Sequence, residues 1–297
     1  MDSASNKRPR SVPDGRQTAP LPEGANAFSE AMPLANRMSQ GPRGIPIFIF
    51  APSRNVFRIT SVHKNVPGSL LELLTEISKS KLNILSVTTS AIPDAESATL
   101  TLVVEASPDV TLRDVKSKLR PSALVPSIEV EPAHSGLVVE DGHFPIIMSG
   151  GERLLLMRAD LFVPMTASLK KTFGTGGDVI LYQMGYSYGE TAMQKFIALM
   201  GRDYVQENFR ELGKVYTALG WCKPTLTKLS PEQGEVEVEM EDSFECSGQR
   251  SMVRGSQFLR GHMTAVMDVA WRKEFSSEET ECISRGDGRC KFEFRAK

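Results

Sequence analysis

Three of the chain's four cysteines lie in its last fifth, and they constrain the fold more than any other feature of the sequence. Cys282 and Cys290 flank the run Gly286-Asp287-Gly288, whose residues tolerate positive φ and favour a tight turn. Apolar and polar residues alternate over 290–294, as they do in a β-strand. A hairpin here would bring the two thiols together beside acidic side chains, and thiolates with carboxylates form a donor set that suits zinc.

The spacing of these cysteines leaves three states of the thiols open. It differs from the paired C-x-x-C pattern of zinc ribbons, so a metal site, unliganded buried cysteines and a disulfide all remain possible. Glu279 and Cys282 are three residues apart, which places them on opposite faces of an unbroken strand. Joint coordination of a metal therefore requires a bulge or short turn around Thr280. Glu278 and Glu281 are rival donors to Glu279.

The run Glu279-x-x-Cys282-x3-Gly286-Asp287-x-x-Cys290, with Cys246 and Arg260-Gly261 upstream, resembles the 4-vinyl reductase domain. That family includes the sensor domains of aromatic-responsive bacterial activators. The resemblance implies a small hydrophobic or aromatic ligand, bound between helices and sheet. It also implies a structural zinc and leaves Cys222 outside the site. The implied zinc ligands are Cys246, Glu279, Cys282 and Cys290. The candidate ligand contacts are Tyr182, Tyr188, Trp221 and His262, and the alternative for each of these four is ordinary core packing.

The length of 297 residues allows two ordinary domains and a tail. A net charge of −1 provides no electrostatic basis for direct nucleic-acid or membrane binding. No apolar run reaches the roughly 20 residues of a membrane span, and no apolar core follows the first basic residues as it would in a signal peptide. Clustered cysteines favour a reducing compartment, so we expect a cytoplasmic protein.

The first half of the chain is predicted to hold a tail and one domain. Residues 1–44 are rich in Pro, Ser, Gly and Asn and lack an apolar period, which predicts a disordered tail. The short apolar run 45–50 predicts an edge strand. Within residues 45–132 the patterns then follow the order β-α-β-β-α-β, which predicts a ferredoxin-like domain. Its expected strands are 56–62, 83–87, 98–104 and 127–130, with helices starting at Ser69 and covering 112–119.

The motif Asn65-x-Pro67-Gly68-x-Leu70, followed by Leu82-Asn83-Ile84, resembles an ACT domain. That family binds amino acids or other small effectors at the loop after the first strand, usually where two copies pair. Gly68 permits close backbone approach, and the free amides at a helix start can receive a carboxylate. The resemblance therefore implies an effector site at Asn65 and Gly68 and a homodimer. Asn65 stands where the family usually has Asp.

Residues 133–149 are predicted to be a polar linker, and residues 150–297 a second domain with helices packed on an antiparallel sheet. Its glycines at 174–177 do not form a dinucleotide-binding loop, because Val179 occupies the position of the third glycine. They predict instead a helix end and a restart capped by Asp178. Gly185 and Gly189 lie on one side of the next helix, where they predict close packing. The remaining expected elements are a helix opening at Asp203 and ending at Gly220, a hairpin over 225–240 and a helix over 251–271.

The whole chain is therefore predicted to be α+β, and its motifs point away from catalysis. It contains no G-x-S-x-G, H-E-x-x-H, P-loop or kinase signature. A zinc held by three thiolates and a carboxylate has no open position, so it would be structural. We expect a ligand-sensing regulatory protein that acts through a partner and has no catalytic residues. Two alternatives remain: an enzyme or assembly factor of tetrapyrrole reduction, as the family name implies, and a scaffold, since the fold resembles subunits of vesicle-tethering complexes.

Overall fold

Two separate units make up the chain, Met1–His143 and Phe144–Lys297. The structure is a computed structural model that describes residues 44–90, 95–148, 151–246, 248, 250 and 255–297. The predicted disordered tail, apart from Gly44, lies outside the described residues. None of the described helices combines the length and apolar character that crossing a membrane requires.

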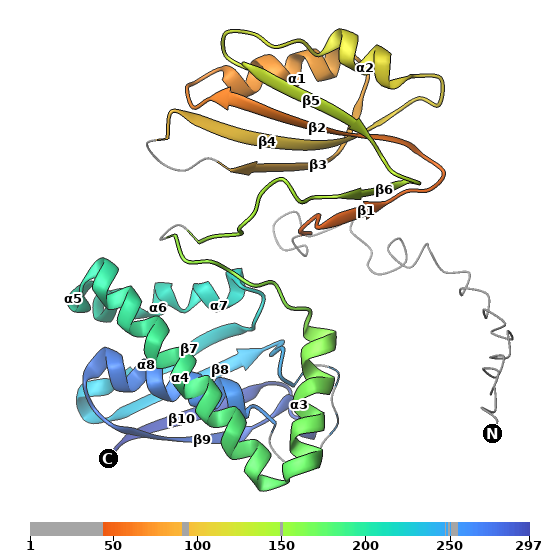
Figure 1. Ribbon diagram of the computed structural model, residues 1–297. Helices are drawn as coiled ribbons and strands as arrows, with labels where there is room; N and C mark the ends of the chain where they lie inside the picture. Colours follow the sequence, from red (N-terminus) through yellow and green to blue (C-terminus); the bar gives the residue numbers. More distant parts are fainter. Residues whose placement is uncertain (1–43, 91–94, 149–150, 247, 249, 251–254) are drawn as a thin grey trace, which may run out of the picture. The chain divides into compact units, whose positions relative to one another are not determined.

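The first unit has the predicted βαββαβ order, and its main sheet is antiparallel throughout with the strand order β3-β4-β2-β5. Both helices lie on one face of this sheet (Figure 1). Ile59, Ile77 and Leu102 are completely buried between the two layers. The elements are β2 (Asn55–Lys64), α1 (Ser69–Lys79), β3 (Asn83–Ser90), β4 (Ser97–Ala106), α2 (Leu112–Lys118) and β5 (Ser127–Pro132).

A separate two-stranded sheet is formed by β1 (Phe48–Phe50) and β6 (Leu137–Val139), which are antiparallel. The run 45–50 therefore pairs with β6 and does not extend the main sheet as an edge strand. β6 also lies inside the predicted linker, which is thus partly structured. Ser135 and Gly136 both have positive φ and turn the chain into β6. A Cβ on Gly136 would lie 2.3 Å from the Cα of Pro52, so only glycine fits at this position.

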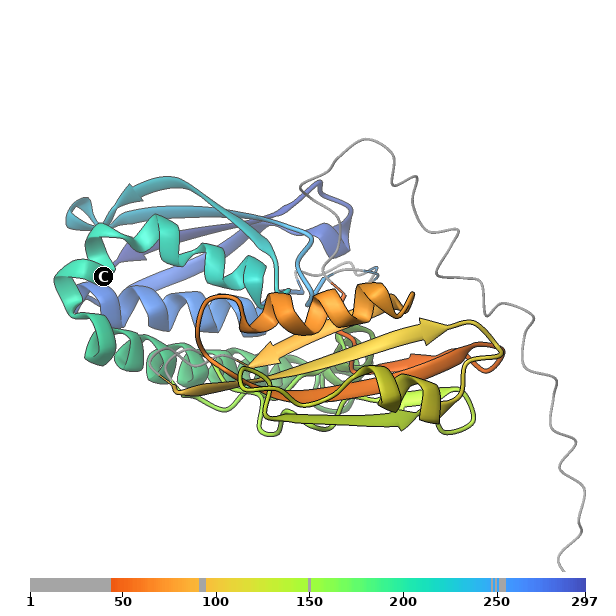
Figure 2. The same cartoon turned by 90° about the horizontal axis from the view of Figure 1, so that it is seen from above.

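The second unit packs helices on an antiparallel sheet, as predicted, with the strand order β7-β8-β10-β9. Val236, Val238 and Met240 point into the core, while the intervening glutamates lie on the other face. Figure 2 shows α8 (blue) against the sheet and α4 (green) on the side of α8 that faces away from the sheet. The strands are β7 (Lys223–Ser230), β8 (Glu235–Glu241), β9 (Phe275–Glu281) and β10 (Cys290–Ala296), and the longer helices are α3 (Ala159–Phe173), α4 (Thr175–Met200) and α8 (Gln257–Trp271).

Two local predictions for this unit differ from the structure. The single helix expected from Asp203 is three short helices, α5 (Arg202–Glu207), α6 (Phe209–Leu212) and α7 (Lys214–Ala218). The chain leaves helical geometry at Asn208, and Gly213 separates α6 from α7. Asp178 does not cap α4. Gly174, with φ of 57°, ends α3 and begins α4, and Asp178 lies in the first turn near Lys170.

The predicted close packing at the glycines of α4 is confirmed. A Cβ on Gly185 would lie 2.0 Å from the carbonyl oxygen of Phe258, and one on Gly189 would lie 2.4 Å from that of His262. A glycine of α8 makes the same kind of contact with α4, since a Cβ on Gly261 would lie 2.0 Å from the carbonyl oxygen of Tyr182. The two helices thus touch backbone to backbone, which only glycine allows.

Candidate metal centre and apolar cavity

A β-bulge in β9 brings Glu279 and Cys282 to the same face of the sheet. Glu281 pairs with Lys291 and Glu279 pairs with Phe292, so Thr280 is an extra residue in the ladder. In a regular strand, residues three apart point to opposite faces, and the extra residue turns Glu279 and Cys282 to the same face. The predicted bulge around Thr280 is therefore confirmed. Of the rival donors, Glu278 is exposed and Glu281 lies 3.7 Å from Arg289 on the outer face.

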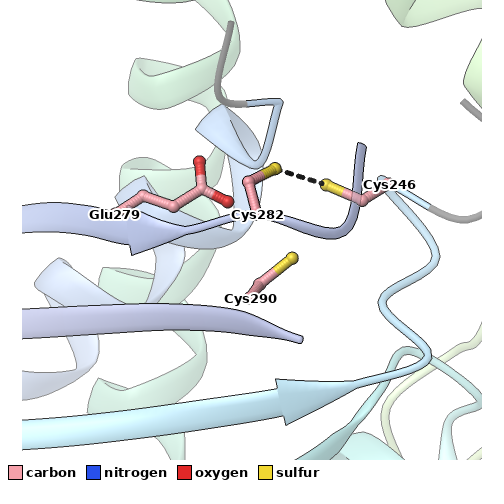
Figure 3. Close-up of side chains that lie close together, drawn as sticks. All are labelled: Cys246, Glu279, Cys282 and Cys290. Carbon is pink, nitrogen blue, oxygen red and sulfur yellow. Dashed lines mark hydrogen bonds between the residues drawn. The ribbon is translucent and has the colours of Figure 1, made fainter. Parts of the chain in front are cut away.

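The structure brings all four predicted metal ligands together (Figure 3). Their ligand atoms lie within 4.8 Å of one another, and the Sγ atoms of Cys246 and Cys282 are 3.6 Å apart. A disulfide would need about 2.05 Å, whereas two sulfurs on one tetrahedral zinc, each at about 2.3 Å from it, lie about 3.8 Å apart. All four cysteines of the chain are free thiols, which removes the disulfide alternative. Cys222 lies elsewhere, against Met240.

Ser256, which the sequence analysis did not single out, connects the members of this cluster. Its hydroxyl lies 2.9 Å from Cys246 Sγ and 3.6 Å from Cys290 Sγ, and its amide donates to Glu279 Oε2 at 3.3 Å. The other carboxylate oxygen, Glu279 Oε1, is buried and has no hydrogen-bond partner among the described residues. A buried carboxylate oxygen left unpaired costs stability, so its place beside three sulfurs fits a bound cation.

The acidic groups of the cluster perturb one another strongly. Burial raises the pKa of Glu279 to about 8. Hydrogen bonds to the sulfurs of Cys282 and Cys290, together with burial, raise the pKa of Cys246, while hydrogen bonds from Cys246 and Cys290 lower the pKa of Cys282. Four acidic groups so close together cannot all ionise without a counter-charge. A divalent cation would supply that charge, and three sulfurs with one oxygen suit zinc better than calcium or magnesium.

Glu245 is a second residue that the sequence analysis missed. Its two carboxylate oxygens accept hydrogen bonds from the amides of Phe258 and Leu259, each at 2.9 Å, at the start of α8. Burial raises the pKa of this carboxyl to about 7, against the lowering effect of those amide hydrogen bonds. Glu245 thereby ties the loop that carries Cys246 to the N-terminus of α8. In the sequence, Glu245 could have been found as an acidic residue next to Cys246 and ahead of a predicted helix, whose first amides need an acceptor.

Lys170 reaches the same region from α3. Its Nζ donates to the carbonyl oxygen of Gly255 at 2.8 Å and lies 3.6 Å from the carboxylate of Asp178. The amide of Gly255 in turn donates to Cys282 Sγ at 3.3 Å. These two bonds hold Gly255 between Lys170 of α3 and the sulfur of Cys282, and such backbone contacts orient a sulfur ligand.

An apolar cavity of about 1150 Å³ lies in the same unit, bordered by α4, α7, α8 and the inner face of the sheet. Tyr188, Trp221 and His262, three of the four predicted ligand contacts, line it. Tyr182 does not: its ring stacks on Tyr186, and the guanidinium of Arg260 lies 4.6 Å from its centre. This contact gives Arg260 a packing role beside Gly261. Other lining side chains include Met184, Phe196, Leu199, Val215, Leu219 and Val266.

An uncharged polar pair stands in the wall of this cavity. The Nδ1 atom of His262 lies 3.1 Å from the hydroxyl of Tyr216, and burial lowers the pKa of His262 to about 4, so the imidazole is neutral at pH 7. The rings of Tyr188, Trp221 and Tyr216 surround this imidazole, with centroid separations of 5.4 to 5.6 Å. This part of the wall offers aromatic faces and an uncharged hydrogen-bonding pair, while Glu152, Arg153 and Lys195 line the cavity elsewhere.

In the first unit, the structure places Asn65 and Gly68 in the loop before α1. The amide nitrogen of Asn65 donates to Glu96 O at 3.0 Å, and its side-chain nitrogen donates to Ala95 O at 3.1 Å. Gly68 has φ of 92° and open space where a side chain would be. The side chain of Asn65 thus already binds the neighbouring loop. The effector role of these two residues stays a prediction.

No protein-family model and no curated protein matches the sequence. Among solved structures, the chain is similar to the phenol-responsive sensory domain of the transcription activator PoxR with phenol, at 18% identity and a TM-score of 0.45, over 50% of this chain and 78% of that one. A trafficking protein particle complex subunit 3 from Naegleria fowleri, covalently bound to palmitic acid, shows 15% identity, coverage of 47% and 95%, and a TM-score of 0.37. A vinyl-4-reductase family protein from Methanocaldococcus jannaschii shows 14% identity, coverage of 48% and 84%, and a TM-score of 0.36. Similarities at this level do not indicate what this chain binds.

Proposed function

We propose that this chain is a small-molecule-sensing regulatory protein whose second unit binds a neutral, largely apolar ligand in the cavity. The observation that carries the proposal is the His262–Tyr216 pair within the aromatic wall of that cavity. Ligand sites are mostly apolar clefts of about 300 to 1,000 Å³ with few polar groups, and this cavity has that character at slightly greater volume. The cavity is open to solvent on one side, where Met184, Tyr188 and Leu199 are exposed, and a concave apolar surface of this size favours a ligand-binding protein over a scaffold.

The ligand class follows from the neutral His262–Tyr216 pair in the aromatic part of the wall. Because the imidazole and the phenol are both neutral at pH 7, they favour a hydroxyl or carbonyl group over a carboxylate. The surrounding rings favour a flat aromatic body. We assign no catalytic role to these residues, and the response would pass to a partner protein.

We further propose that Cys246, Glu279, Cys282 and Cys290 hold a structural Zn²⁺. When bound, the ion would supply the positive charge that the cluster needs, and the four donors leave no position for a substrate. The unpaired Glu279 Oε1 supports this proposal, together with the separation of the sulfurs. Free thiols in such a cluster fit a reducing compartment such as the cytoplasm. The motif order and spacing support a 4-vinyl reductase-type domain.

The first unit is proposed to be an ACT-like regulatory domain, with Asn65 and Gly68 at the effector loop. The βαββαβ order and the positive φ of Gly68 at the start of α1 support this assignment. Isothermal titration with each of the common amino acids, compared between the native protein and Gly68→Val, would test it.

The test of the ligand proposal uses 1-naphthol as a neutral aromatic probe. We expect binding to quench the fluorescence of Trp221, with the signal assigned by a Trp271→Phe background. His262→Phe and Tyr216→Phe each remove a hydrogen-bonding group and should weaken binding about 10-fold or more. Tyr182→Phe is the matched control, because Tyr182 does not line the cavity, and it should bind like the native protein.

Two results would overturn the assignment. One is the absence of probe binding to zinc-loaded, folded protein. The other is unchanged affinity in both His262→Phe and Tyr216→Phe, which would show that the pair does not contact the ligand. Titration with protoporphyrin IX discriminates the tetrapyrrole alternative, since tight binding of that macrocycle with no binding of 1-naphthol would favour it.

A further inference from the structure

The small sheet of the first unit has an apolar outer face that no other described element of this unit covers. Phe48 pairs with Val139 and Phe50 pairs with Leu137 across β1 and β6, so all four side chains lie on one face. Their exposed fractions are 63% for each phenylalanine, 39% for Leu137 and 46% for Val139. We call these four residues the β1–β6 face.

The opposite face of the same sheet is apolar as well. Val138 is buried and Ile49 is partly buried, and both pack with Val56 and Val103 of the main sheet. The two strands are therefore apolar on both faces, which is why Ile45-Pro-Ile-Phe-Ile-Phe50 is a continuous apolar run without alternation. Strands of that composition are typical of sheets covered on both sides.

We propose that the β1–β6 face is covered by the same face of a second copy of this chain. The face contains no charged side chain, so two copies can meet across a twofold axis without bringing like charges together. Sheets pack face to face at about 10 Å with interdigitating side chains, and two phenylalanines per copy suit that spacing. This assembly does not depend on what the cavity of the second unit binds.

The exposed area agrees with a dimer of ordinary size. With about 200 Å² for a full phenylalanine side chain and somewhat less for the aliphatic ones, the β1–β6 face presents about 400 Å² of apolar surface. A specific interface covers about 800 Å² on each partner, slightly more than half of it apolar. The four side chains thus supply most of the apolar area that such an interface contains, and polar atoms at the rim would supply the remainder.

Sedimentation velocity on the full-length protein, from about 1 to about 100 μM, tests the proposal. We expect the native protein to sediment as a species of twice the 32.7 kDa chain mass. The double variant F48S/F50S should weaken dimerisation at least about 100-fold and sediment as a monomer. Leu71→Ser is the matched control: Leu71 is 69% exposed on α1, away from the face, and its loss should leave the dimer unchanged.

A second measurement keeps the test valid if F48S/F50S does not fold. Val139→Cys adds an exposed thiol to a chain whose four native cysteines are buried. A short bis-maleimide should join two copies at this position, and Leu71→Cys should give no such product. The proposal is overturned by a native protein that stays monomeric at all concentrations, by a folded F48S/F50S variant that still dimerises, or by equal cross-linking at both positions.

Discussion

Glu279 is a buried carboxylate whose hydrogen bonds are incomplete without a cation. It is 3% exposed, one of its oxygens has no hydrogen-bond partner among the described residues, and burial raises its pKa to about 8. Three thiols around it cannot supply the missing positive charge. In contrast, the equally buried Glu245 receives two backbone amides and serves as a helix cap. Two buried glutamates near the start of α8, Glu279 in β9 and Glu245 in the loop after β8, thus have different roles, which their hydrogen-bond partners distinguish.

Replacing one sulfur of the cluster should release the metal. For Cys282→Ser we expect the zinc content of protein purified without chelators, measured by ICP mass spectrometry, to fall from about one per chain to near zero. Thermal unfolding should occur at a temperature lower by at least about 10 °C, since metal binding contributes to folding free energy. Cys222→Ser is the matched control, because Cys222 lies outside the cluster, and it should retain its zinc. Full zinc retention in Cys282→Ser would remove this residue from the ligand set.

Burial of a neutral His262 should make stability fall in mild acid. Its pKa is about 4 in the folded chain against 6.5 in a solvated histidine, so between these values the unfolded chain binds more protons. The free energy of unfolding therefore decreases as pH falls from 6.5 to 4, by about 3 kcal/mol in total, and this loss is complete below pH 4. Urea unfolding at pH 7 and pH 5 should show about 2 kcal/mol less acid sensitivity in His262→Gln than in the native protein. The exposed His134→Gln should match the native protein, and equal acid sensitivity in all three would refute the assignment.

At the scale of elements, the crossing of α4 and α8 determines where the cavity lies and where the loop that carries Cys246 lies. α8 contributes His262, Phe258 and Val266 to the cavity wall, and its N-terminus receives Glu245 from the loop of Cys246. The close approach rests on Gly185, Gly189 and Gly261, which bring the two backbones into contact. If α4 and α8 lay farther apart, α8 would shift, and both the cavity wall and the contact of Glu245 with the start of α8 would shift with it.

Gly185→Ala should separate the two helices. The new Cβ would lie 2.0 Å from a backbone oxygen that cannot rotate away, so we expect a loss of about 3 kcal/mol in the free energy of unfolding. Gly176→Ala, on the same helix, meets nothing closer than 3.8 Å and should instead stabilise the protein by up to about 1 kcal/mol, because alanine favours helix. Chemical denaturation of both variants checks the pair, and equal stabilities would show that the helices can move apart at no cost.

At the scale of the whole molecule, the two units have separate hydrophobic cores, and the cluster of Cys246, Glu279, Cys282 and Cys290 belongs to only one of them. Metal removal should therefore destabilise residues 144–297 and leave the main sheet of the first unit intact. Hydrogen exchange after treatment with a strong chelator should show lost protection in β9 and β10 and unchanged protection in β2 and β4. Equal loss in both units would mean that they unfold as one body.

The sequence by itself determined the features that depend on local pattern. Alternation and turn residues predicted the βαββαβ order, the hairpin of β7 and β8, and the strand that begins at Cys290. The three-residue spacing of Glu279 and Cys282 was enough to predict the bulge at Thr280, because strand parity is a local property. The glycines of α4 predicted a close neighbour without identifying it as α8.

Only the tertiary structure decided which groups meet across long separations. It placed Ser256 among the cysteines and brought the carboxylate of Glu245 to the first amides of α8. It paired Tyr216 with His262 and kept Tyr182 out of the cavity wall. It also paired β1 with β6, about 90 residues later in the chain, and so turned part of a predicted linker into a strand. The physical reason is the same in each case: side-chain partners and sheet neighbours depend on packing between distant segments, which local propensity and spacing do not encode.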